Sequence, residues 1–140
     1  MANPANSTAY RLPDGRMAVN VTEAKTLTVA DQGYVQNVIY ANGVVTLPAT
    51  ATEGVWTIRN GGVPVSGGPA GTGDDGNQIS VSPNSSDNIE GGVAGTAIDD
   101  KDLINTAATA RVGDEVTILN NGRTAGPSCI GSKGIWAREA

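Results

Sequence analysis

Few residues in this chain can do acid–base or nucleophilic chemistry. The sequence contains no histidine, which excludes a Ser-His-Asp or Cys-His catalytic centre and any histidine-ligated metal site. Cys129 is the single cysteine, so a cysteine-rich zinc site and an intrachain disulfide are excluded as well. Because no imidazole can serve as its base, Cys129 is predicted to be a small packed thiol.

Clustered carboxylates are the remaining candidates for chemistry. A carboxylate pair can cleave a glycosidic bond, and several carboxylates together can bind calcium. Every cluster lies in a predicted turn, where aspartate commonly bends the backbone, and none follows the EF-hand spacing. The clusters are Asp74 with Asp75, Asp87 with Glu90, and Asp99 with Asp100 and Asp102. We therefore expect no enzymatic activity, no cofactor and no metal site.

The charge balance argues against two classes of partner. The net charge is −5 and the isoelectric point is about 4.5. A nucleic-acid binder needs a basic surface, and anionic membranes also attract basic segments. No apolar run approaches the roughly 20 residues that span a bilayer, and the N-terminus lacks the basic and apolar regions of a signal peptide. We expect neither a nucleic-acid nor a membrane partner.

The composition favours an all-β protein with a thin core. Val and Ile outnumber Leu by 23 to 5, and β-branched side chains suit a pleated sheet. The chain has 19 Gly and 7 Pro, which indicates many turns. Val, Leu and Ile together make only 28 of 140 residues, and there is no Phe. Chains with so little core material often gain burial by association, so we expect an oligomer.

Strand and turn signals alternate along most of the chain. Turns of hairpin type are predicted at 41–43 and 120–123, and a short helical turn near 99–105. The clearest strand patterns cover 34–41, 43–48, 54–60, 78–83, 115–119 and 134–140. About eight to ten short strands at this spacing predict a small sandwich or jelly-roll-like barrel. The segment 44–62 is interpreted as a rigid hairpin within it.

Residues 1–18 differ from the rest and are predicted to form an extended N-terminal arm, followed by a single β domain over 19–140. Pro4 and Pro13 disfavour a helix, and a turn is expected at 13–15. The alternative is an unstructured terminus. The arm offers apolar groups and charged anchors for a partner: Tyr10, Leu12 and Met17, with Arg11 and Arg16.

Three further residues are candidates for core or subunit packing: Trp56, Ile58 and Trp136. In a chain without Phe, tryptophan supplies a large share of the apolar area that can be buried. We therefore predict that both Trp side chains lie in the core or at a subunit interface, and not in a ligand site.

The order of motifs carries a resemblance over residues 26–140. The run TLTVADQGYVQNVIYANGVVTLPATATEGVWTIRNGG is followed by ISVSPNSSDNIEGG, KDLINTAATARVGDEVTIL and GIWAREA. This order resembles the small decoration proteins of tailed-bacteriophage capsids, also called cement or head-stabilising proteins. Similar strand-Leu-Pro modules occur in phage tail fibres and tailspikes, which bind host glycan or protein.

The resemblance implies a structural protein of the virion, made in the host cytoplasm. Such a protein forms a homotrimer on the outer capsid surface, at three-fold and quasi-three-fold positions. It binds the major capsid protein and stabilises the expanded shell. On this interpretation, the arm residues Tyr10, Arg11, Leu12, Arg16 and Met17 contact the capsid. A trimeric tail-fibre or tailspike module is the alternative.

Overall fold

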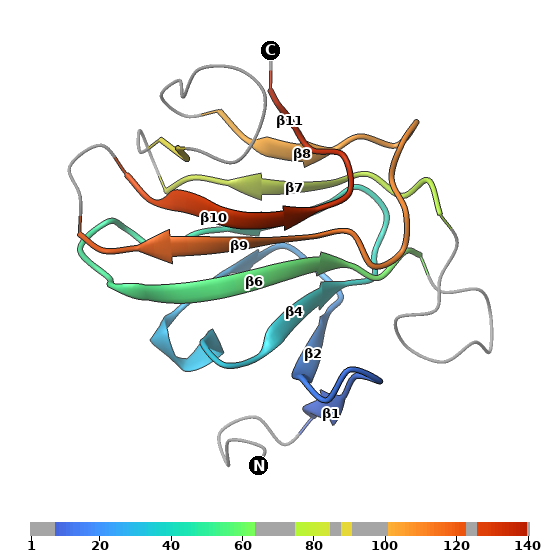
Figure 1. Cartoon of the computed structure of the whole chain (residues 1–140), viewed down its shortest axis with the longest axis horizontal. Coiled ribbons are helices and arrows are strands. Elements are labelled where there is room, and N and C mark those ends of the chain that lie inside the picture. Colours follow the sequence, from blue (N-terminus) through green and yellow to red (C-terminus); the bar gives the residue numbers. More distant parts are fainter. Residues whose placement is uncertain (1–7, 64–74, 85–87, 91–100, 123–125, 140) are drawn as a thin grey trace.

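The computed structural model is a sandwich of two mixed β-sheets (Figure 1). It describes residues 8–63, 75–84, 88–90, 101–122 and 126–139. Sheet A has the strand order β1-β2-β4-β6-β9-β10, and sheet B has the order β11-β8-β7-β5-β3. The predicted all-β class and sandwich are therefore confirmed. The elements are β1 (Tyr10–Arg11), β2 (Met17–Val21), β3 (Lys25–Thr26), the 3-10 helix η1 (Val29–Asp31), β4 (Val35–Val38), β5 (Gly43–Thr46), β6 (Gly54–Asn60), β7 (Ile79–Ser82), β8 (Leu103–Asn105), β9 (Glu115–Asn120), β10 (Ser128–Lys133) and β11 (Ala137–Arg138).

The first half of the chain winds back and forth between the two sheets. Strands β2, β4 and β6 pair in parallel in sheet A, and β3, β5 and β7 pair in parallel in sheet B. Parallel neighbours need a long crossover, and here a strand of the opposite sheet lies within each crossover. Because a jelly roll is built from antiparallel strands, the jelly-roll alternative is wrong.

The corner at Asn42 and Gly43 carries the chain from sheet A to sheet B. Asn42 has a left-handed backbone conformation, with φ of 53°, as Asn-Gly pairs do in tight turns. The Tyr40 hydroxyl holds the corner, since it accepts from the Val44 amide at 2.8 Å and donates to the Val44 carbonyl at 3.1 Å. The turn is confirmed, but the hairpins predicted there and over 44–62 are wrong, because β4 and β6 lie in sheet A and β5 lies in sheet B.

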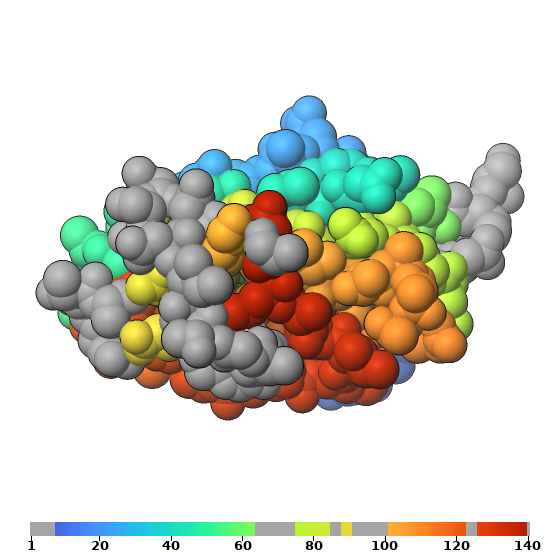
Figure 2. All heavy atoms as spheres, turned by 90° about the horizontal axis from the view of Figure 1, so that it is seen from above, coloured from blue at the N-terminus to red at the C-terminus, as the bar shows by residue number. Residues whose placement is uncertain are grey.

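The second half of the chain pairs in antiparallel fashion. Strand β9 lies between β6 and β10, and β8 lies between β7 and β11. Figure 2 shows the C-terminal segment in red against the orange segment that contains β8. The antiparallel pairing of β9 and β10 confirms that the chain reverses there, whereas the predicted turn at 120–123 lies partly outside the described residues. The helical turn predicted near 99–105 is wrong for Leu103–Asn105, which form a strand.

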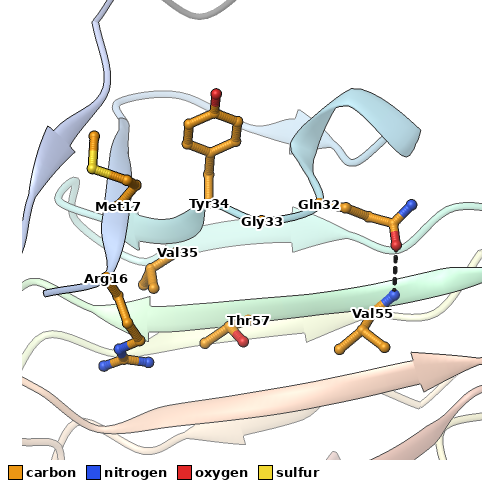
Figure 3. Close-up of a pocket in the computed structure, with 8 residues that line it drawn as sticks. All are labelled: Arg16, Met17, Gln32, Gly33, Tyr34, Val35, Val55 and Thr57. Atoms are coloured by element: carbon orange, nitrogen blue, oxygen red, sulfur yellow. Dashed lines mark hydrogen bonds between the residues drawn. The ribbon is translucent and has the colours of Figure 1, made fainter. Parts of the chain in front are cut away.

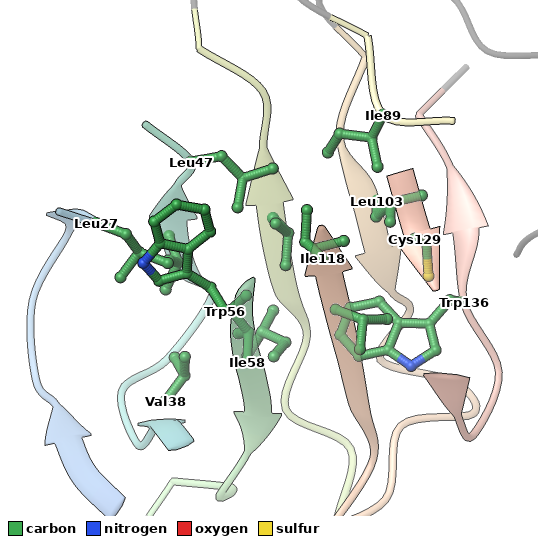
Figure 4. Close-up of a cluster of buried hydrophobic side chains, with 14 of the residues drawn as sticks. Leu27, Val38, Leu47, Trp56, Ile58, Ile89, Leu103, Ile118, Cys129 and Trp136 are labelled. Carbon is green, nitrogen blue, oxygen red and sulfur yellow. The ribbon is translucent and has the colours of Figure 1, made fainter. Parts of the chain in front are cut away.

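The hydrophobic core lies between the sheets and is continuous within one chain (Figure 4). In β6, Trp56 and Ile58 point inward and are 1% and 0% exposed, while Val55, Thr57 and Arg59 alternate with them and face outward. Trp136 is 6% exposed and joins the same cluster. The structure thus places all three predicted packing residues in the core. Other members of the cluster are Val21, Leu27, Val38, Val45, Leu47, Ile79, Val81, Ile89, Leu103, Val116, Ile118 and Cys129.

A buried polar network joins the two sheets at one end of the sandwich. Asn60 at the end of β6 donates from Nδ2 to Oδ1 of Asn105 at 2.7 Å. Asn105 on β8 donates from Nδ2 to Asp114 Oδ2 at 2.9 Å and to the Ile135 carbonyl at 3.0 Å. Asp114 also accepts from the Arg111 amide at 2.9 Å. Since these groups are buried, their mutual hydrogen bonds offset the loss of water.

Candidate functional site

The N-terminal segment forms a β-hairpin at the edge of sheet A. The turn predicted at 13–15 is confirmed, since the Gly15 amide donates to the Leu12 carbonyl at 2.9 Å and Gly15 has φ of 92°. Residues 1–7 lie outside the described part of the chain, so the extended arm over 1–18 stays a prediction. The hairpin brings together the residues predicted for capsid contact: Tyr10, Arg11, Leu12, Arg16 and Met17.

A row of polar side chains crosses the outer face of sheet A, the face turned away from the core. The parallel register places Asn20, Asn37 and Arg59 on neighbouring strands. Arg59 Nη1 donates to Asn37 Oδ1 at 2.6 Å, and Asn37 Nδ2 donates to the Tyr10 hydroxyl at 3.0 Å. That hydroxyl donates to Asn20 Oδ1 at 2.6 Å. The row anchors the hairpin to the sheet.

Burial raises the pKa of Tyr10, although the hydrogen bond from Asn37 and the positive charge of Arg59 act in the opposite direction. The phenol therefore stays protonated at neutral pH and keeps its role as a donor to Asn20.

Arg16 connects the hairpin to β9 through Glu115, and it also pairs with Asp14 in the hairpin turn. Its guanidinium binds both oxygens of Glu115, at 3.1 Å from Nη1 and 2.9 Å from Nη2, and lies 2.8 Å from Asp14. These bonds, with Glu115 first and Asp14 second, raise the pKa of Arg16. In return, hydrogen bonds from Arg16 lower the pKa of Asp14. The pairs are partly exposed, so their effect on stability is modest and their main result is orientation.

A shallow groove of about 410 Å³ runs beside the hairpin on the outer face of sheet A (Figure 3). The Val55 amide donates to Oε1 of Gln32 at 3.0 Å across it, and Val55 itself is 40% exposed. The lining mixes charged, polar and apolar groups: Arg16, Met17, Gln32, Gly33, Tyr34, Val35, Val55 and Thr57. An open groove with such a lining suits contact with another protein better than enclosure of a small substrate.

The five predicted contact residues differ in what they offer a partner. Leu12 is 8% exposed and packs with Ala18, Val35 and the partly buried Tyr10 in a small second core, so it holds the hairpin down. Arg11 is exposed and donates to the Gly15 carbonyl at 3.1 Å. Arg16 and Met17 line the groove. The groups open to a partner are therefore those of Arg11, Arg16 and Met17.

The carboxylate residues singled out in the sequence make structural contacts where they are described. Asp75 accepts from the Val112 amide at 2.7 Å and lies 3.7 Å from Arg111. Asp102 accepts from the Ser82 hydroxyl. Glu90 forms a bridge with Ser128 beside β10 through its backbone. The other members, Asp74, Asp87, Asp99 and Asp100, lie outside the described residues.

Cys129 lies in the core on β10 and is 6% exposed. Its thiol contacts the Gly131 carbonyl at 3.5 Å. Burial raises the pKa of the thiol, and the Gly131 contact and the charge of Arg138 oppose this only in part. The thiolate, which is the reactive form, is therefore disfavoured in the folded chain.

We expect Cys129 to react with iodoacetamide at pH 7 at least about tenfold more slowly in the folded protein than in urea, because both access and thiolate formation are suppressed. Mass spectrometry of timed samples measures the two rates. Free cysteine in the same urea solution controls for the effect of urea on the reagent. Equal rates in folded and unfolded protein would contradict the burial of this thiol.

The polar row Asn20–Asn37–Arg59 is not predicted as a unit by the sequence. The alternation in 54–60 places Arg59 on the outer face of its strand, which is the one available signal. The two asparagines become its neighbours only through parallel pairing, which local sequence does not specify. This surface therefore depends on the register of three strands.

Within the ranges that the structure describes, no helix is long and apolar enough to cross a bilayer, and no three His, Cys, Asp or Glu side chains gather as a metal site. No family model matches the chain, and no curated protein matches it either.

Proposed function

We propose that this chain is a structural virion protein of a tailed bacteriophage. It binds the outer capsid surface as a homotrimer at three-fold and quasi-three-fold positions, contacts the major capsid protein and stabilises the expanded shell. The order of motifs over 26–140 supports this assignment, and so does the two-sheet β fold, which suits a rigid binding module.

The outer face of sheet A is the observation that carries the proposal. It combines an anchored hairpin, partly exposed charges at Arg11 and Arg16, and an open groove with Val55 exposed on its wall. Apolar groups beside oriented charges are typical of protein–protein contact surfaces. We infer that this face lies against the capsid.

The proposal is tested by counting copies in purified virions. A decoration protein is present in hundreds of copies over the head, and a density map of the particle locates it at three-fold positions. The major capsid protein in the same sample serves as the internal standard. A few copies confined to the tail would contradict the proposal and favour the tail-fibre or tailspike alternative.

The homotrimer is a separate prediction. The core closes within one chain, so the thin-core reasoning gives less reason for association than the composition alone suggests. Support for the trimer comes from the resemblance and from large aliphatic side chains on the surface, such as Ile130 and Ile135 at 56% and 60% exposed.

We expect a mass three times the chain's 14.1 kDa by multi-angle light scattering at micromolar concentration. The same measurement over a hundredfold dilution shows whether the assembly dissociates by mass action. A mass of one chain across the whole range would contradict the trimer, and would leave the capsid location to be decided by the virion map.

A further inference from the structure

A second, smaller pocket opens on the outer face of sheet A, next to the hairpin turn. It has a volume of about 160 Å³ and lies between that turn, the end of β6, Gly113 and the end of β10. Three of the nine Lys and Arg residues of this acidic chain line it: Arg16, Arg59 and Lys133. Two carboxylates stand near them: Asp14 in the lining, and Glu115, which is the cross-strand neighbour of both Arg59 and Lys133 but whose carboxylate is bound by Arg16.

The three positive side chains differ in whether they form an ion pair with a carboxylate. Arg16 is occupied by Asp14 and Glu115 at 2.8 and 2.9 Å. Arg59 uses Nη1 for the neutral Asn37 amide, and no carboxylate oxygen among the described residues lies within 4.0 Å of Arg59 or Lys133. The pocket therefore holds two cations whose charge is not neutralised by a direct ion pair within the described part of the chain.

Gly113 leaves the space between these two cations open. A Cβ at this position would lie 3.7 Å from Arg59 Nη2 and 3.8 Å from Lys133 Nζ, so both nitrogens face the same small volume. Gly113 has φ of 98°, and its amide donates to the Asn60 carbonyl at 2.8 Å, which ties the turn to β6. The floor of the pocket is thus backbone held in a fixed position.

We propose that this pocket binds a carboxylate group, presented by an acidic segment of a partner protein. With Nη1 engaged by Asn37, Arg59 keeps its Nε–Nη2 edge, which matches the two oxygens of a carboxylate. Lys133 adds a second positive charge to the same volume, and Leu12 and Pro13 add an apolar wall for the methylene groups. A planar carboxylate on a flexible side chain fits this arrangement.

A single carboxylate is expected to bind weakly, because Lys133 is exposed and dissolved salt screens its charge. We expect a dissociation constant on the order of 1 mM in low salt. The probe is a terminally blocked tetra-glutamate peptide, titrated into isotope-labelled full-length protein. Amide signals of Gly113 and Lys133 should move and saturate, and sodium chloride at about 0.5 M should suppress the movement.

The double variant Arg59→Gln/Lys133→Gln should bind the peptide about tenfold more weakly. The control Lys101→Gln/Arg111→Gln changes the net charge equally, and the Arg111 guanidinium is turned toward Asp75 and the Ala110 carbonyl. It should bind like the parent chain. Lys133→Gln alone, at an exposed position, provides the test if the double variant does not fold.

Equal weakening by the test and control variants would overturn the proposal, since it would indicate general charge attraction. A peptide that moves no signals near Gly113 would overturn it too. Two further titrations use sodium acetate and inorganic phosphate. Acetate binding as tightly as the peptide would overturn the assignment to a protein segment, and tighter phosphate binding would overturn the preference for carboxylate. These measurements use the purified protein alone, so their outcome is independent of the virion count.

Discussion

Replacing Trp56 with alanine is expected to lower the free energy of unfolding by about 3–5 kcal/mol. The ring is 1% exposed, and Leu27 and Leu47 belong to the same buried cluster (Figure 4). Its Nε1 also donates to the Thr28 carbonyl at 2.9 Å. Truncation would leave a cavity that the paired strands on both sides of β6 cannot readily collapse into, and would remove the hydrogen bond from the ring to that carbonyl.

Urea unfolding followed by circular dichroism measures this change, at two protein concentrations so that association is separated from folding. Val55→Ala is the matched control, because Val55 precedes Trp56 on the same strand but is 40% exposed. It should cost less than about 1 kcal/mol. A loss of similar size from both variants would contradict the placement of Trp56 in the core.

Trp56→Phe separates packing from hydrogen bonding at this position. It keeps an aromatic ring in the core but removes the donor to Thr28, so an intermediate loss of about 1–3 kcal/mol is expected.

Local pattern identifies the strands of this chain better than it identifies their partners. The strand predicted at 54–60 has the observed bounds of β6, because Trp56 and Ile58 alternate with Val55 and Thr57 between a Gly and an Asn-Gly turn. In β4 all four residues are buried, because the N-terminal hairpin covers the outer face of this strand. The sequence of β4 therefore shows no alternation of apolar and polar residues by which the two faces of the strand could be predicted. Alternation marks a strand only where one face meets water.

The residue types at a turn likewise predict that the chain changes direction, but they do not predict which sheet the next strand joins. Asn42 and Gly43 permit a left-handed turn, which serves a hairpin or a crossing between sheets equally well. The choice depends on distant pairing of β5 with β7. Strand β10 is not predicted for a different reason. Its sequence SCIGSK lacks alternation of apolar and polar residues, and its register shifts between Cys129 and Gly131.

The sequence predicts some residues of the candidate site, but it does not predict which of them lie next to one another. The sequence assigns Arg16 and Met17 to partner contact, and they do line a groove. It places Arg59 only on the outer face of its strand, and Lys133 lies in a strand that local pattern does not predict. Residues from such distant parts of the chain meet because β6, β9 and β10 pair in register.

Asn105→Ala is expected to lower the free energy of unfolding by about 3 kcal/mol or more, although the side chain is small. Asn105 is 0% exposed and joins Asn60, Asp114 and the Ile135 carbonyl by bonds of 2.7, 2.9 and 3.0 Å. Alanine would leave the Ile135 carbonyl without this donor, would remove one of the donors to Asp114, and would open a cavity beside both.

The network also explains why this substitution should affect more than local packing. Asn60 belongs to sheet A and Asn105 to sheet B, so their 2.7 Å bond fixes one end of the sandwich. Gly134 packs directly against this network, since a Cβ at this position would overlap the Asp114 carboxylate. No larger residue at 134 fits without displacing that carboxylate.

Urea unfolding again provides the measurement, with Asn121→Ala as the matched control, because Asn121 is exposed and its side chain forms no hydrogen bond within the described ranges. The control should change stability by less than about 0.5 kcal/mol. Hydrogen exchange of the Gly113 and Asn60 amides adds a local test, since both amides bond across the turn that Asp114 holds. A buried network of this kind cannot lose its central amide without leaving the partners of that amide unsatisfied, so both stability and exchange protection should fall in Asn105→Ala. If neither changes, this end of the sandwich is held by hydrophobic packing alone.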